Sequence, residues 1–227
     1  MPDRPYQIEA EAASRRGTRH GTNEDAYLAH TAAGLFCVAD GMGGHRDGHI
    51  ASNAIVSILE RTLDPGASFE EQVEITTRAI TGINASLYRQ SRENPQLGIS
   101  GSTVLSLIVG DGYACCLWVG DSRLYLFRDG SLYLVSEDHA EAGGMLTKAV
   151  GSASGLEVDR RVLETRPGDI FLLCSDGLLK GMDEEELANL LGGSGEALTD
   201  RLLAKAITGG STDDITVILV WIGERDG

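Results

Sequence analysis

The stretch TVLSLIVGDGYACCLWVGDSRLYLFRDGSLYLV, residues 103–135, decides the fold. Runs of β-branched, aromatic and other apolar residues alternate here with short turns that each contain Gly-Asp or Asp-Gly. Such turns are typical of β-hairpins, because Asp and Gly tolerate the backbone angles that a tight reversal needs. The stretch therefore predicts four successive antiparallel strands arranged as a meander.

Outside this stretch, strand patterns and helix patterns come in runs rather than in strict alternation. Further strands are predicted at residues 6–13, 26–30, 34–40, 169–175 and 215–222. Helices are predicted at residues 48–63, 68–92, 183–191 and 195–207, where apolar residues recur at helical spacing. This order predicts an α+β fold of antiparallel sheets covered by helices, in one domain spanning residues 1–227.

The composition is that of a globular protein inside the cell. A formal net charge of −15 argues against a nucleic-acid partner, because binding to a phosphate backbone requires clustered Lys and Arg. The four Cys lie in apolar runs without CxxC spacing, as expected of buried, reduced thiols in the cytoplasm. No apolar run approaches the roughly 18 residues of a membrane span, so we expect no membrane contact, and a monomer is the default.

Several carboxylates stand where predicted strands end or begin. They are Asp40 in FCVADGMGGH (36–45), Asp176 in IFLLCSDG (170–177), the pair Asp213-Asp214, and the pair Glu24-Asp25. If they meet at one sheet edge they repel one another unless cations lie among them, and all-oxygen ligand sets suit Mg²⁺ or Mn²⁺. The pattern therefore indicates a metal site. The alternative is a set of turns and helix caps, which fully explains Asp111 and Asp129.

The sequence resembles the PPM-type metal-dependent protein serine/threonine phosphatases, the protein phosphatase 2C family, over residues 6–222. Seven motifs occur in the family's order: NEDAYL at 23, VADGMGGH at 38, GSTVLSLIV at 101, VGDSRLYLFRDG at 119, EDHA at 137, LLCSDGL at 172 and STDDITVILV at 211. The resemblance implies a sandwich of two antiparallel β-sheets flanked by helices. It also implies two Mn²⁺ or Mg²⁺ ions, with a third in bacterial members.

Carried over position by position, the resemblance implies a set of metal ligands. Asp40 bridges the two ions, the Gly41 carbonyl binds one of them, and Asp176 and Asp213 complete the shell of the first. Glu24 or Asp25 serves the second ion, directly or through water. Asp121 matches the position that helps to bind the third ion, the alternative being an ordinary strand turn. Asp214 stands where the family usually has Asn.

The implied reaction is hydrolysis of phosphoserine and phosphothreonine by a hydroxide held between the two ions. His45 is the candidate general acid, the alternative being a structural hydrogen-bonding role. The family's phosphate-binding Arg is replaced by His20, so either Arg19 or His20 is expected to bind phosphate. The flap of bacterial relatives is shortened to AEAGGMLT, residues 140–147, which predicts a more open site.

We therefore expect a metal-dependent phosphoprotein phosphatase in signal transduction, acting on a Ser/Thr kinase or its targets. Two alternatives are a hydrolase of small phosphate monoesters and a pseudophosphatase that binds a partner without turnover. The intact set of Asp40, Asp176 and Asp213 argues against the pseudophosphatase, because unpaired carboxylates repel one another and have no use without metal.

Overall fold

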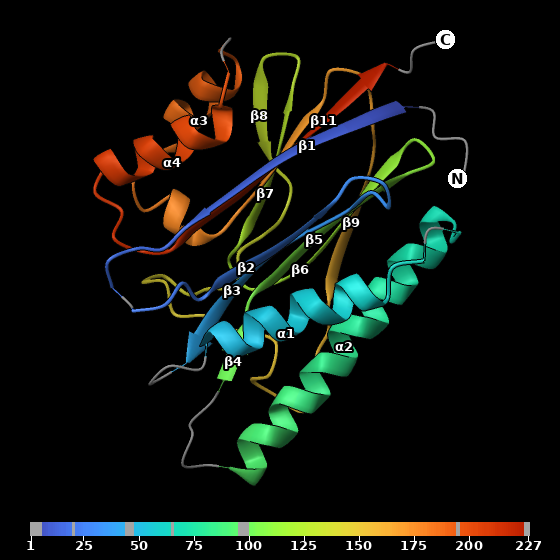
Figure 1. Cartoon of the computed structure of the whole chain (residues 1–227), viewed down its shortest axis with the longest axis vertical. Coiled ribbons are helices and arrows are strands. Elements are labelled where there is room, and N and C mark those ends of the chain that lie inside the picture. Colours follow the sequence, from blue (N-terminus) through green and yellow to red (C-terminus); the bar gives the residue numbers. More distant parts are fainter. Residues whose placement is uncertain are drawn as a thin grey trace.

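The computed structural model of the chain describes residues 6–19, 21–43, 48–64, 66–94, 100–193 and 196–224. Within these ranges the long strands form two antiparallel sheets that pack face to face, and helices cover their outer faces (Figure 1). The predicted α+β sandwich of two antiparallel sheets flanked by helices is confirmed. None of the described helices combines the length and the apolar composition that a membrane span needs.

The first sheet contains both the first and the last described strand. Its order is β1 (Tyr6–Arg15), β11 (Ile215–Glu224), β10 (Ile170–Cys174), β7 (Arg123–Arg128) and β8 (Ser131–Leu134). Helices α3 (Glu184–Leu191) and α4 (Leu198–Thr208) cover its outer face and bury an apolar cluster against β10 and β11. The predicted cap of α3 is present, because Asp183 and Glu186 form a reciprocal capping box.

The second sheet is covered by the other helix pair. Its order is β2 (Asp25–His30), β3 (Leu35–Gly43), β5 (Val104–Gly110), β6 (Tyr113–Val119) and β9 (Asp159–Glu164), and the short β4 (Ser100–Ser102) pairs with the end of β3. Helices α1 (Gly48–Arg61) and α2 (Phe69–Glu93) lie on its outer face. Ser68 and Glu71 form the capping box at the start of α2.

The main core lies between the two sheets. Phe36 and Leu105 of one sheet and Phe171 and Ile218 of the other are fully buried in one cluster. Burial of each such side chain stabilises the fold by about 1.5–3 kcal/mol. Central strands are covered on both faces, which explains why they appear in the sequence as continuous apolar runs rather than as alternating ones.

The predicted four-strand meander is wrong at its centre. Strand β6 pairs with β5 and β9, whereas β7 pairs with β10 and β8, so the chain changes sheets at Gly120–Ser122. The turns at Asp111 and Asp129 are true hairpin turns, with φ of 52° at each Asp. Gly120 instead has φ of 114°, and a Cβ there would lie 2.6 Å from the Thr103 side chain. The three turns have similar composition, so turn chemistry alone could not distinguish the crossover.

Other elements also differ from the prediction. Strand β3 does not stop at Asp40 but continues to Gly43; it pairs with β5 over Leu35–Val38 and with β4 over Gly41–Gly43. Strand β9 was not predicted, because DRRVLE at Asp159–Glu164 carries four charged residues and no clear alternation. It lies at the edge of its sheet, where charged side chains reach solvent.

Candidate metal centre

The predicted carboxylates meet at one end of the sandwich. Asp25 is directly opposite Asp40 in the β2–β3 pair. Asp176 follows β10 and Asp213 precedes β11, and these two strands are antiparallel neighbours. Burial raises the pKa of Asp40 well above its ordinary value, and repulsion from Asp25, Asp176, Asp121 and Asp213 raises it further. Five acidic side chains from both sheets therefore share one electrostatic environment.

The backbone around Asp40 is held firmly in place. Its N–H donates to Thr103 Oγ1 at 2.9 Å, and its carbonyl accepts from the Thr103 N–H at 2.8 Å and from Ser102 Oγ at 2.9 Å. Gly41 is needed next to it, because a Cβ there would lie 2.2 Å from the Gly48 carbonyl oxygen at the start of α1. Gly48 is needed for the same reason, because a Cβ there would lie 2.8 Å from the carbonyl oxygen of Gly41, a predicted ligand.

Asp25 is buried, with one carboxylate oxygen satisfied and the other not. Ser175 Oγ donates to its Oδ2 at 2.7 Å, whereas Oδ1 is buried without a hydrogen-bond partner among the described residues. Burial raises the pKa of Asp25 to about 7, and repulsion from Asp214 and Asp176 adds to this effect. An orphaned carboxylate oxygen is costly unless a proton or a cation completes it.

Asp121 lies at the crossover between the sheets, on the side of the cluster near Asp176. Burial and repulsion from Asp176 raise its pKa to about 6, and the charge of Lys180 opposes this rise. Asp121 therefore interacts electrostatically with the carboxylate cluster, and its role as a third-ion ligand stays a prediction.

Two cations contact the cluster. Lys180 Nζ donates to Asp213 Oδ2 at 2.6 Å and also contacts Asp176 Oδ2, and Arg19 Nη1 donates to the same Asp213 oxygen at 2.9 Å. Burial alone would raise the pKa of Asp213, but these cations lower it below the ordinary value. Lys180 was missed in the sequence, although its position four residues after Asp176 is the spacing at which side chains meet on a helical turn.

The Asp214 side chain holds the loop between β1 and β2 in place. Its Oδ1 accepts the Gly17 N–H and its Oδ2 accepts the Glu24 N–H, each at 2.7 Å. The Asn usual in the family has only one accepting oxygen on its side chain and could not accept both bonds. The carboxylate at this position therefore fixes both ends of the loop that carries Arg19.

Three predicted site residues remain, Glu24, His20 and His45, and the structure describes only the first of them. Glu24 is buried beside the start of α1, where its carbonyl accepts hydrogen bonds from the Gly41 N–H and from Ser52 Oγ. His20 and His45, the candidate phosphate ligand and general acid, lie outside the described residues.

The shortened flap forms a small closed loop. Ala140 and Leu146 form an isolated β-bridge, and the Met145 side chain at its tip is 72% exposed. At the base, His139 Nδ1 accepts the Gly120 N–H at 3.0 Å, which leaves Nε2 to donate its proton to Asp159 Oδ2 at 2.5 Å. This chain of contacts connects the flap to the residue before Asp121.

The donor set fits a hard divalent cation. Every candidate ligand offers oxygen, and the buried Asp25 Oδ1 lacks a partner among the described residues. In the ranges that the structure describes, no three His, Cys, Asp or Glu side chains are already arranged around a single metal position. Lys180 and Arg19 contact carboxylate oxygens of two of the candidate ligands, Asp176 and Asp213.

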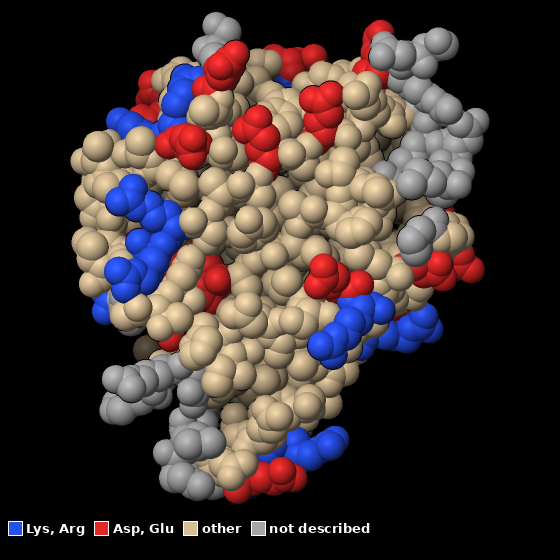
Figure 2. Space-filling view, in the orientation of Figure 1, with Lys and Arg blue, Asp and Glu red and all other residues tan. Residues whose placement is uncertain are grey.

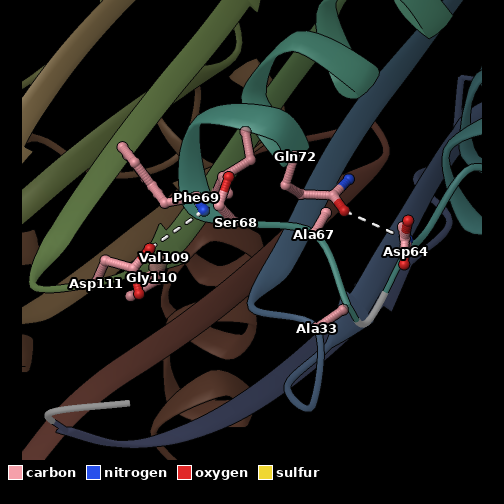
Figure 3. A pocket seen from close by; sticks show the side chains of 10 residues that line it. Ala33, Asp64, Ala67, Ser68, Phe69, Gln72, Val109, Gly110 and Asp111 are labelled. Atoms are coloured by element: carbon pink, nitrogen blue, oxygen red, sulfur yellow. Dashed lines mark hydrogen bonds between the residues drawn. The ribbon is translucent and has the colours of Figure 1, made fainter. Parts of the chain in front are cut away.

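Two cavities lie away from this cluster. One has a volume of about 30 Å³, lies at the other end of β5 between Asp64, Phe69 and Asp111, and has room for a water molecule but not for a substrate (Figure 3). The other, of about 460 Å³, lies on the outer face of the first sheet beside Glu9 and Trp221. Neither is lined by a predicted ligand.

Lys and Arg side chains gather beside the end of β1, at the left of the face in Figure 2.

Comparisons with known proteins agree with this geometry. The family model described as Protein phosphatase 2C matches residues 15–207. The serine/threonine protein phosphatase PstP of Mycobacterium tuberculosis is 30% identical over 95% of this chain, and the chain spans 45% of the length of PstP.

Two solved structures are similar over nearly their whole length. The structure of PppA, described as a key regulatory component of T6SS in Pseudomonas aeruginosa, has a TM-score of 0.89 and 35% identity, covering 95% of this chain and 97% of that one. The catalytic domain of PstP in complex with two manganese ions has a TM-score of 0.83 and 26% identity, covering 96% and 99%.

Proposed function

The chain belongs to the protein phosphatase 2C family, and from this premise we propose that it is a metal-dependent phosphatase of phosphoserine and phosphothreonine in proteins. The observation that carries the proposal is the meeting of Asp25, Asp40, Asp121, Asp176 and Asp213 at one end of the sandwich. Such a cluster raises the free energy of the fold unless cations are bound, which gives the site a reason to bind divalent metal.

The residues proposed to hold Mn²⁺ or Mg²⁺ are those in and beside this cluster. They are Asp40, the Gly41 carbonyl, Asp176 and Asp213, with Glu24 or Asp25 on one side and Asp121 for a third ion. The manganese-bound PstP structure supports this choice of metal. When bound, the ions lower the pKa of water for attack on phosphorus and offset the negative charge of the phosphoryl group.

Arg19 and His45 are the side chains proposed to contact the substrate. Arg19 lies at the rim with 56% of its side chain exposed, so its guanidinium can reach a phosphate while its loop is held by Asp214. A guanidinium binds phosphate with two parallel hydrogen bonds, which favours Arg19 over His20 for this role. His45 remains the proposed general acid for the leaving alkoxide.

The proposed biological setting follows from this chemistry. The substrates would be phosphorylated proteins, including a Ser/Thr kinase or the targets of one. We propose that residues 1–227 form a single phosphatase domain that acts as a monomer in the cytoplasm. The short flap leaves access to phosphate groups on a folded protein surface.

The test is metal-dependent hydrolysis by wild type and by Asp176→Asn. Wild type should hydrolyse p-nitrophenyl phosphate only with Mn²⁺ or Mg²⁺, and Asp176→Asn should lose at least about a hundredfold in kcat/KM, which is about 2.7 kcal/mol of transition-state stabilisation. Asp129→Asn, in a hairpin turn remote from the cluster, is the matched control and should keep wild-type activity.

A second comparison separates the alternatives. Phosphothreonine peptides should be hydrolysed faster than sugar phosphates at equal concentration. A preference for sugar phosphates would indicate a small-ester hydrolase instead. Binding of phosphopeptide without turnover in saturating Mn²⁺ would indicate a pseudophosphatase and contradict the proposal.

A further inference from the structure

Lys180 occupies a position that the metal chemistry does not explain. It follows the short 3₁₀ turn Asp176–Leu178, and its backbone N–H donates to the Asp176 carbonyl at 3.2 Å. Its side chain turns back over this turn, so that Nζ lies between Asp176 Oδ2 and Asp213 Oδ2. One ammonium thus joins two of the predicted metal ligands.

The backbone beneath Lys180 is rigid, but its side chain is not enclosed. Gly181 packs so closely on α4 that a Cβ would lie 1.9 Å from the Ala206 carbonyl oxygen. The Lys180 side chain is 42% exposed. The Cα position is therefore fixed beside the cluster, while the four-carbon stem has solvent on one side into which it can move.

An ammonium and a divalent metal ion compete for the same carboxylate oxygens, because their positive charges repel each other. Asp213 Oδ2 already accepts from both Lys180 and Arg19, and Asp176 Oδ2 contacts Lys180. A metal ion that binds Asp176 and Asp213 through these oxygens would lie close to the ammonium and repel it. Metal binding at these oxygens therefore favours departure of Lys180 from the two carboxylates.

Once displaced, the ammonium remains close to where the substrate phosphate must bind. Its anchor is four residues from Asp176, and its exposed side faces the same rim as Arg19, which also contacts Asp213. A phosphate oxygen is the strongest acceptor that an approaching substrate brings, and a Lys ammonium binds it as a point charge. Arg19 is the proposed phosphate ligand, and Lys180 would add a second positive charge at the same rim.

We propose that Lys180 is a mobile cation of the active site: it neutralises Asp176 and Asp213 until a divalent metal ion displaces it, and then binds the phosphate of the substrate. The second step rests on the proposed phosphatase function, whereas the first does not. The first step makes metal binding weaker than the ligand set alone would allow, because each binding event breaks an existing ion pair.

Calorimetric titration of Mn²⁺ into the chelator-treated full chain tests the first step without any turnover. Lys180→Met should bind Mn²⁺ about three- to tenfold more tightly than wild type, as expected when a competing, partly exposed ion pair is removed. Lys205→Met is the matched control, because Lys205 is 41% exposed and pairs with Glu186 between helices α4 and α3, not with a predicted metal ligand. This control should leave the Kd unchanged, and an unchanged Kd in Lys180→Met would overturn the proposal.

Steady-state kinetics at saturating Mn²⁺ test the second step. Lys180→Met should raise KM for a phosphothreonine peptide about five- to tenfold and change kcat by less than about twofold, because a ground-state phosphate contact is lost. Lys180→Arg should recover most of the KM. Tighter Mn²⁺ binding with an unchanged KM would overturn the phosphate role alone. Absence of turnover in wild type would contradict the proposed function and would leave the calorimetric comparison valid.

Discussion

Replacing Asp214 with Asn should destabilise the protein, although Asn is the usual residue at this place in the family. Asp214 accepts the Gly17 and Glu24 N–H groups through its two oxygens at 2.7 Å, and its side chain is buried. Asn can accept only one of these bonds, and its NH₂ group would face the other N–H. A hydrogen bond to a charged acceptor contributes about 1.5–3 kcal/mol, and a buried N–H without an acceptor costs about 1–3 kcal/mol.

One effect works in the opposite direction. Loss of the Asp214 charge relieves repulsion on Asp25, but burial is the main cause of the raised pKa of Asp25, so this relief is the smaller effect. We therefore expect a net loss of about 2 kcal/mol in the free energy of unfolding. For a chain of this size that corresponds to a fall in Tm of about 4–8 °C.

The assay is thermal unfolding followed by circular dichroism in excess chelator, with urea unfolding to give the free energy. Asp129→Asn is the control, because Asp129 lies in a hairpin turn with φ of 52°, where Asn is equally well tolerated. If Asp214→Asn unfolds at the wild-type temperature or above, the two-acceptor account of this residue is wrong.

Two further predictions concern backbone space and pH. Gly177→Ala should lower the free energy of unfolding by about 3 kcal/mol or more, because its Cβ would lie 1.9 Å from the Asp214 carbonyl oxygen. Gly82→Ala in α2 meets open space and should raise the free energy of unfolding by about 0.5–1 kcal/mol. Equal urea midpoints for the two variants would contradict this. The folded chain without metal holds protons on Asp25 (pKa about 7) and Asp121 (pKa about 6) that the unfolded chain releases near pH 4, so its stability should fall as pH rises from about 4 to 7. Mn²⁺ competes with these protons, so the rise in Tm that it causes should be larger at pH 8 than at pH 5.5, and the opposite order would refute the assignment.

The sequence was sufficient for most elements because their signals are local. Periodicity and caps located α2 and α3, and the Asp-Gly turns at Asp111 and Asp129 located two hairpins. The crossover at Gly120–Ser122 could not be found in this way, since the choice between pairing with β6 and pairing with β10 depends on strands far away in the sequence. A turn specifies a reversal but not the sheet in which the next strand lies.

Part of the candidate site could also be predicted from the sequence. Asp40 and Asp176 were identifiable because each follows a buried strand and is not followed by a strand of matching pattern, and the resemblance added Asp213; the structure brings the three together. Lys180 and the two bonds of Asp214 depend on side-chain direction and on contacts between distant segments. The spacing of four residues between Asp176 and Lys180 permits their contact, but the contacts of Lys180 with Asp213 and of Asp214 with Gly17 and Glu24 join segments that are distant in the sequence.

The carboxylates that converge at the metal centre belong to different layers of the sandwich: Asp25 and Asp40 come from the second sheet, and Asp176 and Asp213 from the first. A cation bound by carboxylates of both sheets would link the two sheets at the end of the sandwich, where the inter-sheet core meets solvent. Sliding of one sheet past the other would separate the four carboxyl groups. Metal binding should therefore make such sliding less favourable. Protection of the β3 and β10 amides from hydrogen exchange should therefore increase when the metal binds.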